Sequence, residues 1–292
     1  MSEPKKFRAA LVQMRTSRNV IGNIDAAASL IREAAAQGAD YVQTPEQTAL
    51  MELDRASLFS HIVEEERDLA LAAFQELARE LKINLHIGSL AVKVTPDKAA
   101  NRAFFIDPNG EIIGRYDKIH MFDVNLANGE SYRESNTYRP GEVAVVVDRP
   151  FARIGLTICY DVRFPALYRA LAEAGADVLT VPAAFTKQTG EAHWNLLLRA
   201  RAVETGCFVL AAAQGGHHEN GRDTYGHSII VDPWGRVLAE AGIEPGLTIA
   251  DIDLALVAEA RGRVPALDHG RRFEMVAPAK DGGRLHLVGK AS

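Results

Sequence analysis

The two halves of the chain repeat the same short motifs in the same order, and this repeat limits the folds that the chain can adopt. GADYVQTPEQ at 38–47 matches GADVLTVPAA at 175–184 in Gly, Ala, Asp, the apolar pattern and Pro. FFIDPNGEIIGR at 104–115 matches SIIVDPWGRVLAE at 228–240. The two pairs are separated by similar distances along the chain, which indicates two diverged halves with an insertion.

Each half contains the same series of predicted elements. These are an opening strand, an alanine-rich helix, a short buried strand that ends at a proline, a second helix, a third strand and a hairpin closed by a type I turn. In the first half they lie at 7–14, 24–37, 41–44, 66–82, 84–92 and around 107–110. In the second half they lie at 151–159, 165–174, 178–181, 193–206, 208–214 and around 232–235. Gly38 and Gly175 follow the alanine-rich helices, where glycine commonly ends a helix.

Helices that alternate with buried strands predict an α/β protein. Two equal halves, each a sheet covered by helices on one side, would bury their free sheet faces against each other in a four-layer α-β-β-α sandwich. A single doubly wound sheet fits the same pattern, so the residues alone leave both architectures open. After about Val257 the chain is rich in Arg, Gly and Pro and loses periodicity. We therefore expect one domain at 7–256 and an arm at 257–292 that packs on the body or on a partner subunit.

The composition excludes several classes of protein. The chain has 292 residues, of which 47% are hydrophobic and 24% are charged, as is typical of globular proteins. The formal net charge of -5 argues against a non-specific nucleic-acid binder. No apolar run of signal-peptide or membrane-helix length is present, so we expect a cytoplasmic protein without a membrane partner. Two cysteines favour free thiols over a disulfide framework.

Three chemically distinct side chains follow predicted strands, at the edge where α/β proteins place their active groups. Glu46 comes directly after Pro45, Lys118 follows the first hairpin, and Cys159 ends the first strand of the second half. A thiol can attack a carbonyl carbon, a carboxylate can accept the thiol proton and later activate water, and an ammonium can stabilise the oxyanion. Together these residues predict acyl transfer.

Each of the three residues also has a structural alternative. Cys159 could be a small buried hydrophobe, which is what we expect of Cys207 in its apolar run. Glu46 and Lys118 could be ordinary surface charges. Cys159 nevertheless precedes a predicted helix that begins near Pro165, and a helix N-terminus lowers the pKa of a nearby thiol.

Other catalytic patterns are weaker in this chain. His217, His218 and His227 lack a familiar metal-ligand spacing with Cys or carboxylates, so we expect no metal site. No Gly-x-Ser-x-Gly elbow indicates a serine hydrolase. No Gly-x-Gly-x-x-Gly follows a predicted strand, which argues against a dinucleotide cofactor.

Four segments together resemble the nitrilase, or carbon–nitrogen hydrolase, superfamily over about residues 7–275. They are TPEQ around Glu46, GRYDKIHMFD around Lys118, ICYDVRFP around Cys159, and YGHSIIVDPWG. The resemblance implies the α-β-β-α sandwich, a homodimer or higher homo-oligomer, and a site without metal or cofactor.

The same resemblance assigns roles to individual residues. It implies that Glu46 is the general base, that Lys118 stabilises the oxyanion and that Cys159 is the nucleophile. It further implies that the backbone N–H of Tyr160 is a second oxyanion donor. Glu134, in SYRESNTYRPG, matches a second glutamate that the family places near this triad.

The sequence around the nucleophile also indicates a branch of the superfamily. True nitrilases carry Cys-Trp-Glu there, whereas this chain has Cys-Tyr-Asp, as the amidase branches do. The segments 181–205 and 211–228 look most like the deaminated glutathione amidases and the ω-amidases, although Asn195 stands where those usually have Glu. The resemblance thus implies a cysteine-dependent amidase that converts the terminal amide of a small carboxylate-bearing molecule to acid and ammonia. Deaminated glutathione is the first candidate substrate and 2-oxoglutaramate the second; an N-carbamoyl hydrolase or a non-catalytic binding relative are the alternatives.

The candidates for substrate binding follow the first two strands of the second half. They are Arg163, Phe185, Thr186 and His193, with Arg199 and Arg201 further along the chain. Arginine is suited to bidentate binding of a carboxylate. Structural ion pairing at a dimer interface is the alternative for each of the charged residues, and we expect at least one of them to face the ligand.

Overall fold

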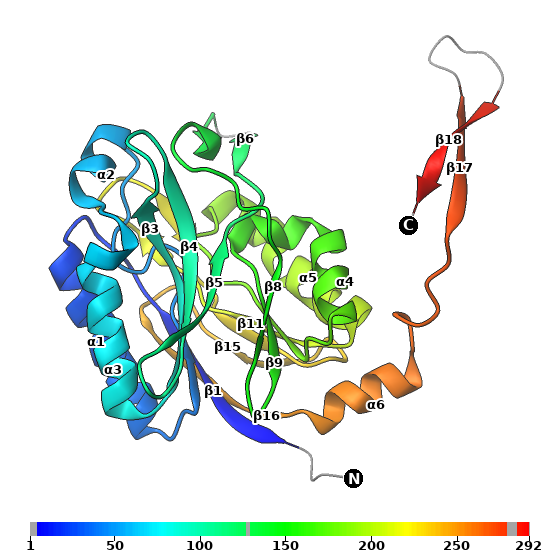
Figure 1. The fold of residues 1–292 in the computed structure, drawn as a ribbon, viewed down its shortest axis with the longest axis horizontal. Coiled ribbons are helices and arrows are strands. Elements are labelled where there is room, and N and C mark those ends of the chain that lie inside the picture. The colour runs from blue at the N-terminus through cyan, green and yellow to red at the C-terminus, as the bar shows by residue number, and fades with distance from the viewer. Residues whose placement is uncertain (1–4, 127–128, 279–284, 292) are drawn as a thin grey trace.

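Two six-stranded sheets pack face to face at the centre of the molecule, and helices cover their outer faces (Figure 1). The structure, a computed structural model, describes residues 5–126, 129–278 and 285–291. The predicted four-layer α-β-β-α sandwich is therefore confirmed, and the doubly wound single sheet is not formed.

The first sheet has the strand order β16-β1-β2-β3-β4-β5. Its strands are β1 (Lys6–Gln13), β2 (Tyr41–Gln43), β3 (Asn84–Lys93), β4 (Ala99–Ile106), β5 (Ile112–Asp117) and β16 (Gly246–Asp253). Helices α1 (Val20–Ala36) and α3 (Leu69–Leu81) cover it, with the shorter α2 (Arg55–His61) and a 3-10 turn (Glu65–Arg67) between them in sequence.

The second sheet has the matching order β15-β14-β11-β10-β9-β8. Its strands are β8 (Val145–Asp148), β9 (Arg153–Leu156), β10 (Val178–Thr180), β11 (Phe208–Ala211), β14 (Ile229–Val231) and β15 (Val237–Glu240). Helices α4 (Pro165–Glu173) and α5 (Lys187–Thr205) cover it. Small hairpins also lie outside the two sheets, among them β6 (Asp123–Asn125) with β7 (Ser131–Arg133), and β12 (Gly215–His217) with β13 (Asp223–Tyr225).

The duplication includes the strands that join the halves. In each sheet three parallel strands are followed by two antiparallel ones, and a sixth strand pairs antiparallel with the first. In each sheet the sixth strand follows the other half of the repeat in sequence. Strand β8 comes after the first half and pairs with β9 of the second, and β16 comes after the second half and pairs with β1 of the first. Each half therefore contributes to both sheets, which holds the two layers in register.

Local turn chemistry agrees with the sequence pattern in both halves. The two hairpin turns are closed by hydrogen bonds from Gly110 N to Asp107 O and from Gly235 N to Asp232 O, each 2.9 Å long. Gly38, after α1, has a φ of 81°, a left-handed conformation that favours glycine. The predicted turns and this helix end are confirmed.

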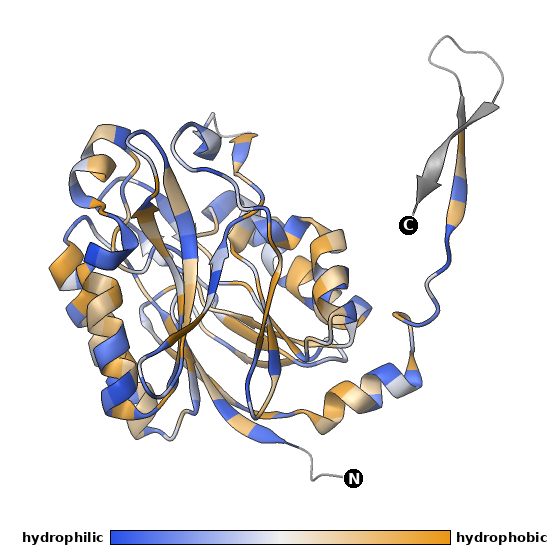
Figure 2. Ribbon diagram, in the orientation of Figure 1, coloured by the Kyte–Doolittle hydropathy of each residue, from blue (hydrophilic) through white to orange (hydrophobic). Residues whose placement is uncertain are grey.

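The strands bury both of their faces. Along β1, Phe7, Ala9 and Leu11 pack in the core that includes the second sheet, whereas Ala10 and Val12 pack in the core formed with α1 and α3. This alternation follows from the two-residue period of a strand. Strands of the inner layers are largely apolar in Figure 2, as two-sided burial requires.

The C-terminal segment leaves the sandwich after a short helix, α6 (Ala255–Arg263). Val257 and Ala260 of this helix are buried, so the first residues of the expected arm pack on the body. Beyond it, the hairpin of β17 (Phe273–Pro278) and β18 (Leu285–Ala291) extends away from the sandwich in Figure 1. Residues 279–284 and 292 of the expected arm lie outside the described residues.

No helix in the described ranges combines the length and the apolar character that crossing a membrane requires.

Candidate active site

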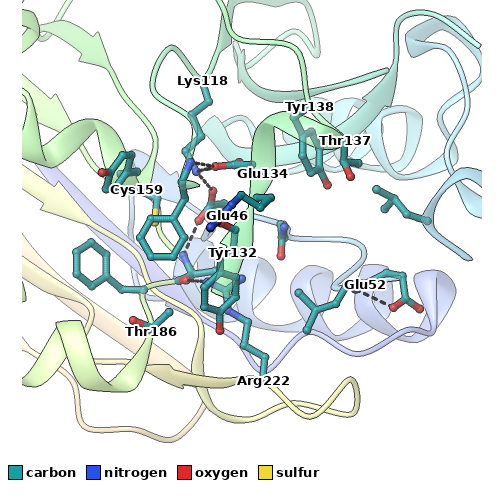
Figure 3. A pocket seen from close by; sticks show the side chains of 18 of the residues that line it. Glu46, Glu52, Lys118, Tyr132, Glu134, Thr137, Tyr138, Cys159, Thr186 and Arg222 are labelled. Atoms are coloured by element: carbon teal, nitrogen blue, oxygen red, sulfur yellow. Dashed lines mark hydrogen bonds and ion pairs between the residues drawn. The ribbon is translucent and has the colours of Figure 1, made fainter. Parts of the chain in front are cut away.

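A cavity of about 250 Å³ lies where segments that follow strands of both sheets come together. Seven of the residues singled out in the sequence line it: Glu46, Lys118, Glu134, Cys159, Tyr160, Phe185 and Thr186. Figure 3 shows the side chains of Glu46, Lys118 and Glu134 pointing toward one another, with Cys159 beside them. The fold thus gathers residues that are far apart in the sequence.

Glu46 is held from three directions. It lies just beyond β2, after Pro45, and is only 3% exposed. Its Oε1 accepts hydrogen bonds from Asn101 Nδ2 at 2.8 Å and Lys118 Nζ at 2.9 Å. Its Oε2 accepts a hydrogen bond of 2.8 Å from the backbone N–H of Ala184. A buried carboxylate with this number of donors is both fixed in place and stabilised as the anion.

Lys118 follows β5 directly, and its backbone N–H donates to Asn101 O at 3.0 Å, which extends the β4–β5 pairing by one step. Its ammonium donates to Glu46 Oε1 and to both oxygens of Glu134, at 3.0 and 2.9 Å. These three contacts use the three protons of the ammonium. A developing oxyanion can therefore be bound when one of the two bonds to Glu134 opens.

Glu134 begins the 3-10 turn Glu134–Asn136, next to the β6–β7 hairpin. Besides the pair with Lys118, its Oε2 accepts from the backbone N–H of Phe122 at 2.7 Å and its Oε1 accepts from Asn101 Nδ2 at 3.2 Å. Because both oxygens are occupied, Glu134 is suited to orienting Lys118.

Cys159 stands at a strained turn between β9 and α4. Strand β9 ends at Leu156, and Cys159 opens a 3-10 turn (Cys159–Arg163) with a φ of 49°. A non-glycine residue in the left-handed region costs on the order of 1–3 kcal/mol, so the surroundings must hold it there. The backbone N–H of Cys159 donates to Pro182 O at 2.9 Å, which anchors the turn to the segment after β10.

A buried carboxylate, Asp161, completes the support of this turn. Its Oδ2 accepts from the backbone N–H of Ile158 at 2.9 Å and from the Tyr116 hydroxyl at 2.7 Å. Its Oδ1 lies 3.1 Å from the backbone nitrogen of His120 and 2.7 Å from Nδ1 of the same residue. Asp161 thus links the cysteine turn to β5 and to the segment after Lys118.

The charges of the site determine its protonation. Burial opposes the ionisation of Glu46, but the charge and hydrogen bond of Lys118 outweigh it and lower the Glu46 pKa. Burial likewise opposes the charge of Lys118, and the carboxylates of Glu134 and Glu46 reverse this and raise the Lys118 pKa well above its usual value. At neutral pH the free site therefore holds a carboxylate beside an ammonium.

The expectation of a lowered thiol pKa is wrong. Burial and the neighbouring Glu46 carboxylate raise the Cys159 pKa well above its ordinary value, although Lys118 opposes the shift. Two carboxylates already neutralise Lys118, so a thiolate would add an unmatched negative charge to a buried site. In addition, α4 begins at Pro165, after the five-residue 3-10 turn, so its N-terminus does not start at the sulfur. Cys159 therefore rests as a thiol.

The candidates for carboxylate binding divide into two groups. Arg163 and His193 contact each other at 3.3 Å. The Arg163 guanidinium lies 5.2 Å from the ring centre of Phe185, which lines the cavity. Neither Arg163 nor His193 is among the described residues of the lining. Arg199 and Arg201 bond to carbonyls elsewhere, Gly235 O and Val162 O. Both arginines lie on α5, and neither is among the described residues that line the cavity.

Among the polar residues of the site that the sequence interpretation missed, two act directly on Glu46. Asn101, in β4, donates hydrogen bonds to both Glu46 and Glu134. It lies within a hairpin strand and not after a strand end, so the pattern that selects Glu46, Lys118 and Cys159 does not select it. Arg222, between β12 and β13, lines the cavity, and its charge lowers the pKa of Glu46. The signal for Arg222 was a charged residue between glycine and aspartate in a polar loop, a pattern that many surface loops share.

No group of three or more His, Cys, Asp or Glu side chains that could hold a metal ion is found in the part of the chain that the structure describes. His217 pairs with Asp223 at 2.9 Å. His218 bonds to Thr16 O, and His227 stacks on the ring of Tyr225.

Known proteins resemble this chain in both sequence and structure. The model of the carbon-nitrogen hydrolase family matches residues 8–262. A deaminated glutathione amidase from Synechocystis sp. is 42% identical over 272 residues, which cover 91% of this chain and 98% of that protein. The crystal structure of the C. elegans NitFhit protein is similar, with a TM-score of 0.85 and 35% identity; the match covers 92% of this chain and 66% of that one.

A third similarity concerns an enzyme with a modified cysteine. A mutant of the amidase from Nesterenkonia sp. AN1 is 28% identical with a TM-score of 0.78, over 92% of this chain and 95% of that one. It is described as showing covalent addition of the acetamide moiety of fluoroacetamide at its active site cysteine. The family match and these relatives agree with the fold and with the resemblance seen in the sequence. This chain belongs to the carbon–nitrogen hydrolase family, as a hydrolase of carbon–nitrogen bonds other than peptide bonds.

Proposed function

We propose that the chain is a cysteine-dependent amidase that hydrolyses an amide of a small carboxylate-bearing molecule to the acid and ammonia, or to the acid and an amine where the amide nitrogen is substituted. The observation that carries this proposal is the shared cavity of Cys159, Glu46 and Lys118, in which one network fixes the carboxylate and the ammonium. Thiol, base and cation at one site are the groups that acyl transfer requires.

In the first step, Glu46 accepts the proton of the Cys159 thiol while the sulfur attacks the amide carbon. The raised thiol pKa and the lowered Glu46 pKa mean that this proton moves only when the attack neutralises the developing thiolate. A carbon–sulfur bond forms, and the carbonyl oxygen becomes an oxyanion. Glu46 therefore serves as a general base and is not a partner of a preformed thiolate.

The oxyanion is stabilised by two donors. Lys118 provides one N–H when a bond to Glu134 opens, and the backbone N–H of Tyr160 provides the other. Tyr160 is the second residue of the 3-10 turn that starts at Cys159, where backbone N–H groups lack partners within the turn. Loss of one such donor typically costs about 2.7–4 kcal/mol of barrier.

The intermediate then collapses and the acyl group is released. Glu46 returns its proton to the leaving nitrogen, the carbon–nitrogen bond breaks, and ammonia, or the amine cysteinylglycine in the case of deaminated glutathione, departs and leaves a thioester on Cys159. Glu46 next takes a proton from water as the water oxygen attacks the thioester. The carbon–sulfur bond breaks, the thiol regains its proton, and the carboxylic acid leaves. One water is consumed for each ammonia released.

Deaminated glutathione is the first candidate substrate. The support is the name of the Synechocystis relative, whose match covers nearly its whole length. The Cys-Tyr-Asp sequence at 159–161 argues for amides over nitriles by resemblance to the amidase branches.

A hydrolysis assay tests both the reaction and the substrate: it follows cysteinylglycine released from deaminated glutathione and ammonia released from the other compounds. It compares deaminated glutathione, 2-oxoglutaramate, an N-carbamoyl amino acid, a nitrile and an uncharged amide of similar size. We expect the highest kcat/KM for deaminated glutathione and no ammonia from the nitrile. Release from the N-carbamoyl compound alone would reassign the substrate class, and an inactive protein would contradict the amidase proposal.

We further propose that two copies of the chain associate as a homodimer, with the segment from 257 onward serving as an arm. The hairpin of β17 and β18 stands away from the body, and Phe273, Met275 and Val276 on β17 are exposed. Exposed apolar side chains on an extended segment favour a protein contact. Light scattering on the full chain and on a chain that ends at Asp268 tests this; a monomeric full chain would contradict it.

A further inference from the structure

Arg222, a cation that lines the cavity of Cys159 together with Lys118, has an incomplete set of hydrogen bonds. Arg222 lines the cavity from the loop between β12 and β13. Its Nη2 donates to the carbonyl oxygen of Ala184. Its Nε is buried and has no hydrogen-bond partner within the described part of the chain. A buried donor without a partner is costly, which indicates a missing acceptor.

The surroundings of Arg222 hold the guanidinium in place without neutralising it. The Tyr132 ring centre lies 5.4 Å from Arg222 Cζ, a cation–π distance. Figure 3 shows Arg222 next to Tyr132, with Tyr132 drawn between Arg222 and Glu46. Among the described residues, no ion pair joins Arg222 to a carboxylate, in contrast to Lys118, which pairs with both Glu46 and Glu134.

Arg133 lines the same cavity, but both terminal nitrogens of its guanidinium already donate hydrogen bonds. Its Nη1 donates to the carbonyls of Val124 and Tyr132, and its Nη2 donates to Asn125 Oδ1. These bonds lie within the β6–β7 hairpin and its ends. Both terminal nitrogens of the exposed Arg133 thus have partners, whereas Arg222 retains a buried donor without one among the described residues.

We propose that Arg222 binds the substrate carboxylate and so selects anionic amides over uncharged ones. This inference rests on the proposed amidase function and names the residue that recognises its substrate class. A carboxylate oxygen would accept from the buried Nε and a second N–H of the planar guanidinium, the geometry in which arginine binds carboxylates. The sequence had placed this role among Arg163, Arg199, Arg201 and His193.

A structural role for Arg222 makes a different prediction. Arg222 bonds to the carbonyl of Ala184, whose N–H holds Glu46 Oε2. If Arg222 served only to position Ala184, its loss would disturb Glu46 and would slow every amide to the same extent. The comparison of a charged with an uncharged substrate therefore separates binding from positioning.

The kinetic test uses Arg222→Gln, Arg222→Lys and the matched control Arg133→Gln. For deaminated glutathione we expect Arg222→Gln to lower kcat/KM about 10- to 100-fold, mainly through KM, as for a lost charged hydrogen bond. The uncharged amide should lose clearly less, because it has no carboxylate for Arg222 to bind and shares only the indirect effect on Glu46. Arg222→Lys should recover part of the loss, because it restores the charge but not the planar pair of donors. Arg133→Gln should have a small effect on both substrates.

Two kinetic results would overturn the proposal. One is an equal loss for charged and uncharged amides in Arg222→Gln, which would assign Arg222 a positioning role. The other is an equal loss for the charged amide in Arg133→Gln and Arg222→Gln, which would show that the general positive potential attracts the anion.

A binding measurement keeps the inference testable if no amide is turned over. Titration calorimetry with glutarate, a dicarboxylate without an amide, compares Cys159→Ala with Cys159→Ala/Arg222→Gln. We expect the affinity to fall about 10- to 100-fold in the double variant. Unchanged affinity would overturn the role of Arg222, whereas failure of the amidase proposal would show as an absence of amide hydrolysis by the wild type.

Discussion

The backbone N–H of Ala184 donates a 2.8 Å hydrogen bond to Glu46 Oε2, and this bond joins the two halves of the duplication. Ala184 lies two residues after Pro182, in the turn that matches the turn of Pro45 and Glu46 in the first half. The carboxylate of one half is therefore held by the backbone of the equivalent turn in the other. The two equivalent turns thus differ in role: one carries the carboxylate and the other orients it.

Glu46→Gln keeps the shape of the side chain and removes its basicity. We expect kcat to fall about 10²- to 10⁴-fold with little change in KM, because the amide cannot accept the thiol proton. The new NH₂ group also meets a donor on whichever side it points, so the melting temperature should fall. Steady-state kinetics and thermal unfolding measure both effects. A variant that raises KM alone would contradict the role of general base.

Lys118→Ala should abolish most activity and also destabilise the fold. Removal of the ammonium leaves Glu46 and Glu134 facing each other in a buried site, and breaking a buried ion pair typically costs about 3–5 kcal/mol. Lys118→Ala/Glu134→Gln should recover much of the stability but none of the activity. Chemical denaturation and ammonia release distinguish the two effects; recovered activity in the double variant would contradict the role of Lys118.

The two cysteines should differ sharply. Cys159→Ala removes the nucleophile that lines the cavity and should abolish turnover. Cys207 is fully buried in the core, where its thiol donates to Ala176 O at 3.2 Å, so Cys207→Ala should reduce stability and keep kcat near the wild-type value. Ammonia release with circular dichroism as a folding control provides the comparison. Substantial activity in a folded Cys159→Ala variant would exclude the proposed mechanism.

The raised pKa of Cys159 predicts that the resting enzyme contains no thiolate at neutral pH. The ultraviolet absorbance that thiolates show near 240 nm should not differ between wild type and Cys159→Ala at pH 7. A difference should develop only above the ordinary thiol range near pH 9. A titration with a midpoint below pH 7 would instead favour a preformed thiolate.

His86 should make the fold sensitive to acid. Burial lowers the pKa of His86 to about 3, from an ordinary value of 6.5. Below pH 6.5 the unfolded chain binds a proton that the folded chain does not, so the free energy of unfolding falls by up to about 1.4 kcal/mol per pH unit until the pH approaches 3. His86→Phe should make this decline shallower between pH 6.5 and 4.

The control for that experiment is His61→Gln, at the exposed end of α2. Denaturation curves at several pH values give the slope for each protein. An unchanged slope in His86→Phe would mean that other groups cause the acid sensitivity. The substitution should cost some stability at pH 7 as well, because it removes the 2.9 Å contact between His86 Nδ1 and the Tyr41 hydroxyl.

The sequence by itself determined the elements of the fold and the main groups of the site. Periodicity and turn chemistry predicted the repeated strands and helices of the two halves and both Asp-Pro-x-Gly hairpins, because these depend on neighbouring residues. The elements α2, α6 and β8 lie outside that repeat and were not predicted. The repeated motifs indicated two equivalent halves. Glu46, Lys118 and Cys159 could be selected because each follows a strand, and the parallel strands of a sheet end at a common edge.

Only the tertiary structure decided how the halves combine and how the site is charged. The pairing of β16 with β1 joins the two ends of the sandwich domain, and the local sequence carries no signal for it. The protonation of Cys159 was misjudged for a related reason. A thiol pKa depends on the sum of nearby charges and on burial, and the carboxylates around Lys118 come from separate parts of the chain.

The arginine that we propose to bind the substrate anion also could not be selected from the sequence and emerged only from the tertiary structure. The sequence favoured arginines and a histidine that follow strands close to Cys159, whereas the cavity receives Arg222 from a distant polar loop. A loop residue has no periodic pattern that fixes its direction, so its place is decided by the packing of the β12–β13 hairpin against the site. Residue types and strand ends can be read from the sequence, but which side chains share one cavity follows from how the sheets pack.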